Sequence, residues 1–182
     1  PRPQRPWGDF PVDFWVQLVV GLLAWTIAAG VWSFRSADPA ARYLLVCGFC
    51  TLLFAPLAAV YSTRELALPA QQFRWLCDFN FFGGAVYAGA MMALLWYYPR
   101  RLGRLAPGPP VLVLYAAWWL AQQLRLLDDM VLARRSLVFV ALLGTFWLAT
   151  LQWRRSRADP VARAALQWFL LSWVVGISLF SM

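Results

Sequence analysis

The side chains in this sequence that could do chemistry are polar residues near the ends of two strongly apolar stretches. Asp78 and Asn80 stand at the start of one stretch, and Gln122 and Gln123 stand at the end of another. Polar groups at membrane depth are energetically costly, which makes them candidate functional residues by default. Three residues in the adjoining turns complete the candidate set, namely Arg74, Arg125 and Asp128. If the two stretches are neighbouring helices, these side chains would rim one pocket with an apolar floor, which suits an amphiphilic small molecule.

The same residues also have a simpler interpretation. Charged side chains at helix ends can mark the membrane interface, where Arg and Asp pair with each other or reach lipid headgroups. Alanine substitutions at Asp78, Gln122 and Arg125 separate the two hypotheses. If all three left the response to a signal unchanged, ligand binding at these residues would be excluded.

No catalytic constellation accompanies the candidate residues. The sequence has no His, which removes imidazole metal ligands, histidine general bases and a phospho-accepting His. Cys47 and Cys50 form a CxxC, but no further ligand stands nearby in the sequence. We therefore interpret the pair as small packing side chains rather than as a redox or metal site. We expect no catalytic residues, no metal and no cofactor in this chain.

Long apolar stretches must position these residues. The chain is 62% hydrophobic and 13% charged, with a mean hydropathy of +0.60. A membrane-spanning helix needs about 20 apolar residues, and hydrocarbon forces each span to be helical. The sequence therefore predicts an all-α, polytopic transmembrane bundle of six spans, forming part of a longer bundle. The stretches are Phe14–Phe34, Tyr43–Tyr61, Phe79–Tyr98, Val111–Leu124, Ser136–Trp153 and Ala164–Phe180.

Two Asp-Pro elbows connect predicted helices. Asp38 suits a helix N-cap and Pro39 suits the first helical position, and Asp159 and Pro160 repeat the pattern. We expect the helices on either side of each elbow to be antiparallel neighbours. The segment 62–78 is expected to be a turn.

Small residues recur every four positions in the third stretch, at Ala85, Gly89 and Ala93, with Gly84 just before them. Small side chains at this spacing let two helix backbones approach closely. We expect these four residues to lie at a helix–helix contact.

The charge pattern indicates topology. All 16 cations are Arg, set against eight acidic residues, for a net charge of +8. Because the Arg residues lie at helix ends, membrane topology and anionic headgroups account for them, and lipid rather than nucleic acid is the expected partner. Nine Arg fall on the side of the Asp-Pro elbows and seven on the other side, which places the elbows inside. Residues 1–13 are expected to be an extracytoplasmic linker and residues 14–182 a transmembrane domain.

Four motifs occur in a characteristic order: Trp7-Gly8-Asp9-Phe10 leading to Phe14-Trp15, Asp38-Pro39-Ala40-Ala41-Arg42, Leu94-Leu95-Trp96-Tyr97-Tyr98-Pro99-Arg100-Arg101, and Asp159-Pro160-Val161-Ala162-Arg163 leading to 166–171. In this order the chain resembles the polytopic sensor region of bacterial histidine kinases of the competence and quorum-sensing type. That family often has Phe-Pro where this chain has Tyr98-Pro99. Its ligand-binding residues vary between members, so the resemblance implies no binding residues here.

The resemblance implies a signal-sensing domain in the bacterial inner membrane. An extracytoplasmic segment would precede it, a cytoplasmic kinase would follow it, and the full-length protein would be a homodimer. Two alternatives stay open on the residues alone, namely a small transporter or channel unit and an accessory scaffold subunit. A transporter requires a polar path through the membrane, whereas every acidic residue here is predicted to lie near a helix end.

Overall fold

The structure, a computed structural model, describes residues 10–62, 68–124, 126 and 130–180. Within these residues all the regular secondary structure is helical and there is no strand. The prediction of an all-α chain is confirmed. The elements are α1 (Val12–Phe34), α2 (Pro39–Ser62), α3 (Ala70–Tyr97), α4 (Gly108–Gln123), α5 (Met130–Arg155), the short 3-10 helix η3 (Ser156–Ala158) and α6 (Pro160–Phe180).

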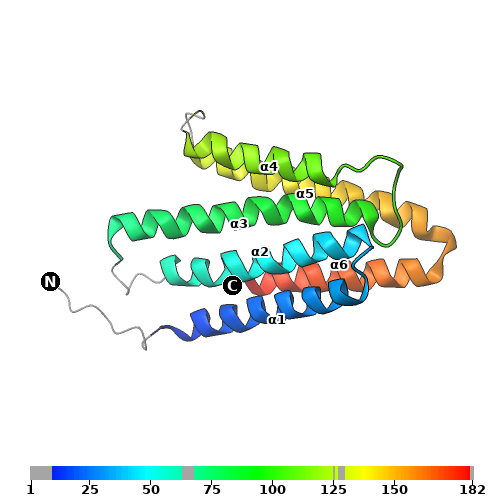
Figure 1. Ribbon diagram of the computed structural model, residues 1–182, viewed down its shortest axis with the longest axis horizontal. Helices are drawn as coiled ribbons and strands as arrows, with labels where there is room; N and C mark the ends of the chain where they lie inside the picture. The colour runs from blue at the N-terminus through cyan, green and yellow to red at the C-terminus, as the bar shows by residue number, and fades with distance from the viewer. Residues whose placement is uncertain (1–9, 63–67, 125, 127–129, 181–182) are drawn as a thin grey trace.

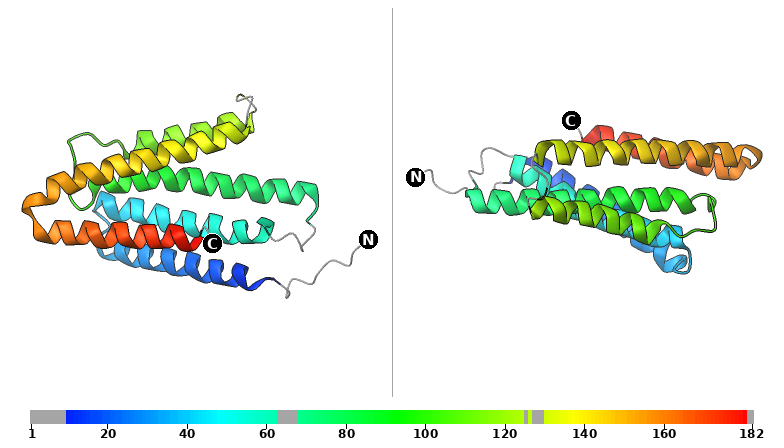
Figure 2. Two further views of the ribbon diagram at one scale, coloured as in Figure 1. Left: turned by 180° about the vertical axis from the view of Figure 1, so that it is seen from behind. Right: turned by 90° about the horizontal axis from the view of Figure 1, so that it is seen from above.

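The helices run back and forth between two ends of an elongated bundle (Figure 1). We call one end the elbow end, where residues 35–38, 98–107 and 156–159 join successive helices. The opposite end carries the start of α3 and the end of α4. Helix α3 occupies the centre, where it packs against α2, α4 and α5. Seen from above, α5 and α6 both lie on the same side of α3 and α4 (Figure 2).

Four helical segments are long and apolar enough to cross a membrane: Val12–Phe34, Pro39–Val60, Ala70–Tyr97 and Arg135–Ala158. Helix α4 has 16 residues, about 24 Å of helix, which is shorter than the roughly 30 Å hydrocarbon core. Helix α6 is apolar over Pro160–Val175. Four segments are therefore candidate membrane spans by length and composition, while spans through α4 and α6 remain predictions from the sequence.

Large apolar side chains cover the outside of the bundle. Phe146 on α5 is 74% exposed, and Ile27 on α1 and Trp168 on α6 are also exposed. Soluble monomers rarely present contiguous apolar surfaces of this extent. Lipid is the environment in which such a surface is stable, because it is as apolar as these side chains.

Both elbows have the expected local structure. The Asp38 carboxylate accepts the backbone N–H of Ala40 at 2.9 Å, and Pro39 opens α2. The Asp159 carboxylate accepts the N–H groups of Val161 at 3.0 Å and Ala162 at 3.1 Å. Helices α1 and α2 then pack together as antiparallel neighbours. Helices α5 and α6 are also antiparallel, but they diverge away from their elbow (Figure 2).

Helix α3 begins at Ala70, so the prediction of a turn over 62–78 is wrong for its last nine residues. Gln, Arg, Leu and Ala are good helix formers, and the absence of apolar periodicity does not stop them from forming helix. The 28 residues of α3 span about 42 Å, roughly 12 Å more than the hydrocarbon core. Figure 1 shows α3 projecting past its neighbours at the opposite end. Its first two turns can therefore be polar at the membrane interface.

The small residues of α3 face its neighbours, with one exception. Ala85, Gly89 and Ala93 are buried, and a Cβ added to Gly89 would lie 3.3 Å from the Leu112 side chain of α4. Gly84 has no atom within 4 Å of that position. The close approach to α2 is made at Gly83, whose added Cβ would lie 3.1 Å from Phe54.

Candidate functional site

A pocket of about 520 Å³ opens between the first turns of α3 and the last turn of α4. This volume lies within the range of small-molecule sites. Its lining combines polar and aromatic side chains from the two helices: Gln71, Arg74, Trp75, Asp78 and Phe79 from α3, and Trp119 and Gln123 from α4.

Helical periodicity explains why these side chains meet. Positions 71, 74, 75, 78 and 79 follow the i, i+3, i+4, i+7, i+8 pattern of a single helix face. On α4, Trp119 and Gln123 are one turn apart, which places them on one face as well. The pocket is therefore a consequence of the early start of α3, since an irregular 70–78 segment would scatter these residues.

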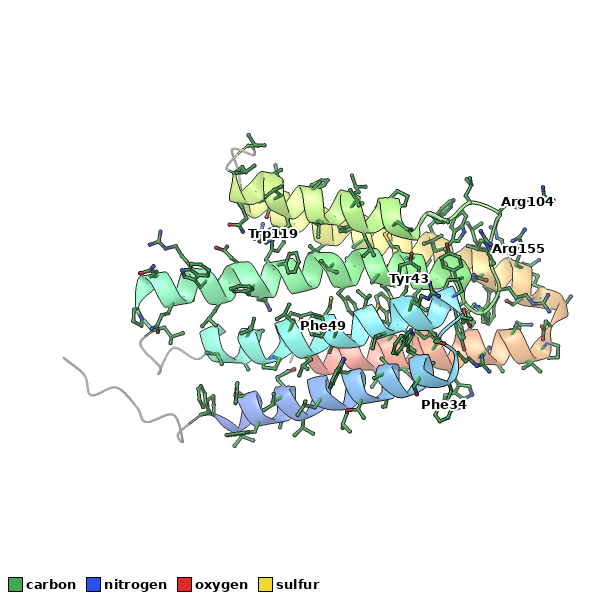
Figure 3. The ribbon with its side chains drawn as sticks, viewed as in Figure 1. Phe34, Tyr43, Phe49, Arg104, Trp119 and Arg155 are labelled. Carbon is green, nitrogen blue, oxygen red and sulfur yellow. The ribbon has the colours of Figure 1, made fainter. Side chains whose placement is uncertain are left out.

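Aromatic rings form the walls of the pocket. The rings of Trp75 and Phe79 stack with centroids 6.1 Å apart. Phe82 meets the Trp119 ring edge to face at 4.9 Å. The Trp119 indole N–H also donates to the backbone carbonyl of Asp78 at 3.3 Å, which ties α4 to α3 (Figure 3). These contacts fix the ring positions and leave an apolar surface between them.

Two residues that carry hydrogen-bond donors, Arg74 and Gln123, line this pocket. The Gln123 amide nitrogen is buried and has no hydrogen-bond partner within the described residues. Arg74 makes one long bond, from Nε to the Ala70 carbonyl at 3.4 Å. A buried amide donor without a partner costs about 1–3 kcal/mol. A ligand carrying a hydrogen-bond acceptor would remove that cost, and the guanidinium would strengthen its binding.

The structure brings together three of the seven predicted ligand-binding residues, namely Arg74, Asp78 and Gln123. Asn80 lies elsewhere, because its amide donates to the Phe54 carbonyl of α2 at 2.8 Å. Gln122 does not line the pocket: it is buried between helices, and neither of its amide atoms has a partner in the described structure. Arg125 and Asp128 lie outside the described residues.

Four pocket residues were not among the predicted ones: Gln71, Trp75, Phe79 and Trp119. The spacing of the five pocket residues on α3 is a signal in the sequence, but it indicates a common helix face only if residues 70–78 are assigned to helix. Cys47 and Cys50, the CxxC pair, are both buried in α2, and Cys47 packs against Ala90 and Met91 of α3.

The elbow end holds a second polar cluster, built around Gln152. Its amide nitrogen donates to the carbonyls of Leu95 and Arg100, at 2.7 Å each. Gln17 on α1 and Gln167 on α6 make no such interhelical bond within the described residues. Arg155 donates to the carbonyls of Arg101, at 3.1 Å, and Leu102. Helix α5 thus holds the 98–107 loop against the end of α3.

An ion pair links the same loop to the second elbow. Arg100 donates to the carboxylate of Asp159. The backbone N–H of Ala162 and the neighbouring Arg100 guanidinium hold the pKa of Asp159 below its ordinary value of 3.8. This carboxylate therefore stays charged at neutral pH, when it both caps α6 and anchors the loop.

Comparison of the chain with protein-family models, curated proteins and solved structures finds no match in any of the three. The candidate site therefore has to be interpreted from its own geometry.

Proposed function

We propose that this chain is the signal-receiving membrane domain of a sensor histidine kinase, and that an amphiphilic small molecule binds in the α3–α4 pocket. The observation that carries the proposal is an aromatic-walled pocket lined by Arg74 and by Gln123, whose amide nitrogen has no hydrogen-bond partner within the described residues. The donors suit an acceptor-bearing head group, and the rings of Trp75, Phe79 and Trp119 suit an alkyl chain.

The position of the pocket supports an amphiphile in particular. The first turns of α3 project beyond its neighbours (Figure 1). Because α3 is about 12 Å longer than the hydrocarbon core, these turns are expected at the level of the lipid headgroups. A molecule dissolved in the outer part of a bilayer would reach this site with its polar head already at the right level. Membrane lipid is then the medium from which the signal arrives.

The central place of α3 supports a receiving rather than a purely structural role. Helix α3 packs against α2, α4 and α5, so a ligand held between α3 and α4 acts on a helix that contacts three others. A ligand shifts a conformational equilibrium only by its difference in affinity for the two arrangements. The kinase that would read the shift, the inner-membrane location and the homodimer rest on the family resemblance of the sequence motifs.

The acidic residues favour a receptor over a proton-driven transporter. Among the described residues, Asp13, Asp38 and Asp159 lie at helix ends, and Asp78 lies near the start of α3. A proton-coupled path needs titratable groups at mid-membrane depth. Within the described structure, the middle of the bundle is packed with apolar side chains and small residues.

Photolabelling of the 182-residue chain in nanodiscs tests the proposal. The probe is decanoic acid with a diazirine on its alkyl chain. We expect labels within 71–79 and 119–123 that excess unlabelled decanoate suppresses and that Arg74→Ala reduces. Arg135→Ala is the matched control, because this exposed Arg lies near the same end of the bundle but outside the pocket. Labels spread over lipid-facing helices, unaffected by competitor, would refute the proposed site.

A further inference from the structure

A second pocket, of about 370 Å³, lies at the elbow end and is separate from the proposed signal site. It is formed where the end of α3, the following loop and the last turns of α5 meet. Its residues are Trp96, Leu102, Trp147, Leu151, Arg154 and Arg155. We propose that this pocket binds one anionic phospholipid, with the phosphate at the two arginines and an acyl chain along Trp147 and Leu151.

The α5 side of the pocket changes from apolar to cationic along one helix face. Trp147, Leu151, Arg154 and Arg155 are related by i+4, i+7 and i+8. Eight residues of helix cover about 12 Å, so the pocket runs from the charged end of α5 into the apolar depth of the bundle. Trp147 is 59% exposed, so this groove is open to lipid. An ionic head at one end and hydrocarbon at the other match a lipid better than a soluble anion.

The loop side of the pocket is held in place by hydrogen bonds. Leu102 donates its N–H to the Trp96 carbonyl at 2.9 Å, and Gly103 lies so close to the Trp96 ring that an added Cβ would be 3.2 Å from it. Arg155 fixes the same loop through its bonds to the carbonyls of residues 101 and 102. The pocket is therefore built into the fold rather than left by a loose surface loop.

Donors without partners point to an anionic occupant. Arg155 uses only Nη1 for the loop carbonyls, and Arg154 makes no hydrogen bond or ion pair with any described residue. Trp96 also lines the pocket, and its indole nitrogen is buried without a partner in the described structure. Guanidinium groups bind phosphate oxygens through several directed bonds. Figure 3 shows Arg104 and Arg155 together at this end of the bundle.

Local acidic groups do not neutralise the two arginines. Among the described residues, the acidic side chains of the elbow end are Asp38, which caps α2, and Asp159, which caps α6 and pairs with Arg100. Neither lines this pocket. The predicted orientation places the elbow end inside, where membranes expose anionic lipid and each nearby Arg contributes about 1 kcal/mol of attraction.

Native mass spectrometry of the detergent-solubilised chain tests the site, because it identifies bound lipid by mass. The probes are dioleoylphosphatidylglycerol, dioleoylphosphatidylcholine and glycerol 3-phosphate. We expect one phosphatidylglycerol adduct at low lipid ratio, with little phosphatidylcholine or glycerol 3-phosphate bound. Arg154→Gln should weaken phosphatidylglycerol binding about tenfold, the lower end for a lost charge-assisted bond.

Two further variants make the result decisive. Arg157→Gln removes an exposed charge three residues away from Arg154 and outside the pocket, and it should change binding less than about twofold because surface charges act weakly. Leu151→Trp fills the groove without altering charge and should abolish the phosphatidylglycerol adduct. Equal loss in Arg154→Gln and Arg157→Gln would show a diffuse basic surface and overturn the proposal. Strong glycerol 3-phosphate binding, or an adduct retained in Leu151→Trp, would overturn it as well.

Discussion

Replacing Gln152 by Met should lower the free energy of unfolding by about 2 kcal/mol, because Gln152 supplies hydrogen bonds that the backbone cannot make for itself. The carbonyl of Leu95 lies in the last turn of α3, where its helical donor would be the N–H four residues later. That residue is Pro99, which has no N–H. The Gln152 amide takes its place at 2.7 Å and bonds the Arg100 carbonyl as well.

The expected magnitude follows from which groups are left without partners. The Leu95 carbonyl would be orphaned in a fully buried position, at a cost of about 2 kcal/mol. The Arg100 carbonyl lies nearer the surface, where water can replace the lost bond, so about 1 kcal/mol is expected from it. Removal of the Gln152 amide oxygen, which is itself buried and unpartnered within the described structure, offsets about 1 kcal/mol.

Unfolding of the chain by sodium dodecyl sulfate in mixed micelles, followed by tryptophan fluorescence, measures this difference. Gln17→Met is the matched control, because Gln17 makes no side-chain hydrogen bond within the described residues and should lose less than about 0.5 kcal/mol. Hydrogen exchange of the 98–107 loop should speed up in Gln152→Met and stay unchanged in the control. Equal stabilities for the two variants would refute the assignment of Gln152 as the partner of α3's last turn.

Three further outcomes are expected. Gly83→Leu should destabilise the chain by about 1–3 kcal/mol through overpacking against α2, whereas Gly84→Leu should be nearly neutral. Thermal unfolding measures both variants, and equal effects would contradict the packing described. Asp159→Asn should lower the melting temperature at neutral pH. Because the pKa of Asp159 is lowered in the fold, the difference in melting temperature between wild type and Asp159→Asn should be constant above pH 3.8 and vanish as the pH falls through the lowered pKa. A difference that stays unchanged at acidic pH would show that the charged carboxylate is unimportant. Gln122→Met should raise the free energy of unfolding by about 1–2 kcal/mol, since it removes a buried amide without described partners; a loss of stability in chemical denaturation would contradict this.

The sequence predicts the helices well because lipid imposes a simple rule. Each of the six apolar stretches corresponds to one helix, and both Asp-Pro elbows cap helices as their residue types require. Hydropathy does not define where a helix ends once it leaves the hydrocarbon. Hydropathy therefore predicts a turn at the polar start of α3, although the residues from Ala70 onward favour helix.

The site was only partly predictable for a related reason. Adjacent residues on a helix point about 100° apart, so Gln123 lines the pocket while Gln122 is buried between helices. Asn80 finds its partner on α2, 26 residues away in sequence, which no local pattern encodes. The position of Pro99 predicts that the Leu95 carbonyl lacks its helical donor. The residue that supplies the missing donor, Gln152, is known only from the packing of α5 on α3.

The central claim is that the α3–α4 pocket binds an amphiphile through Arg74 and Gln123. The most direct measurement is the Kd of a brominated decanoate, followed in nanodiscs by bromine quenching of Trp75 and Trp119, with Trp→Phe variants to assign the signal. Loss of the charge-assisted bond in Arg74→Ala should raise the Kd about 10- to 100-fold, and Gln123→Leu should raise it about fivefold. Arg135→Ala should leave the Kd unchanged. Saturable quenching with these ratios is the predicted result, and one Kd shared by all four proteins would contradict the account.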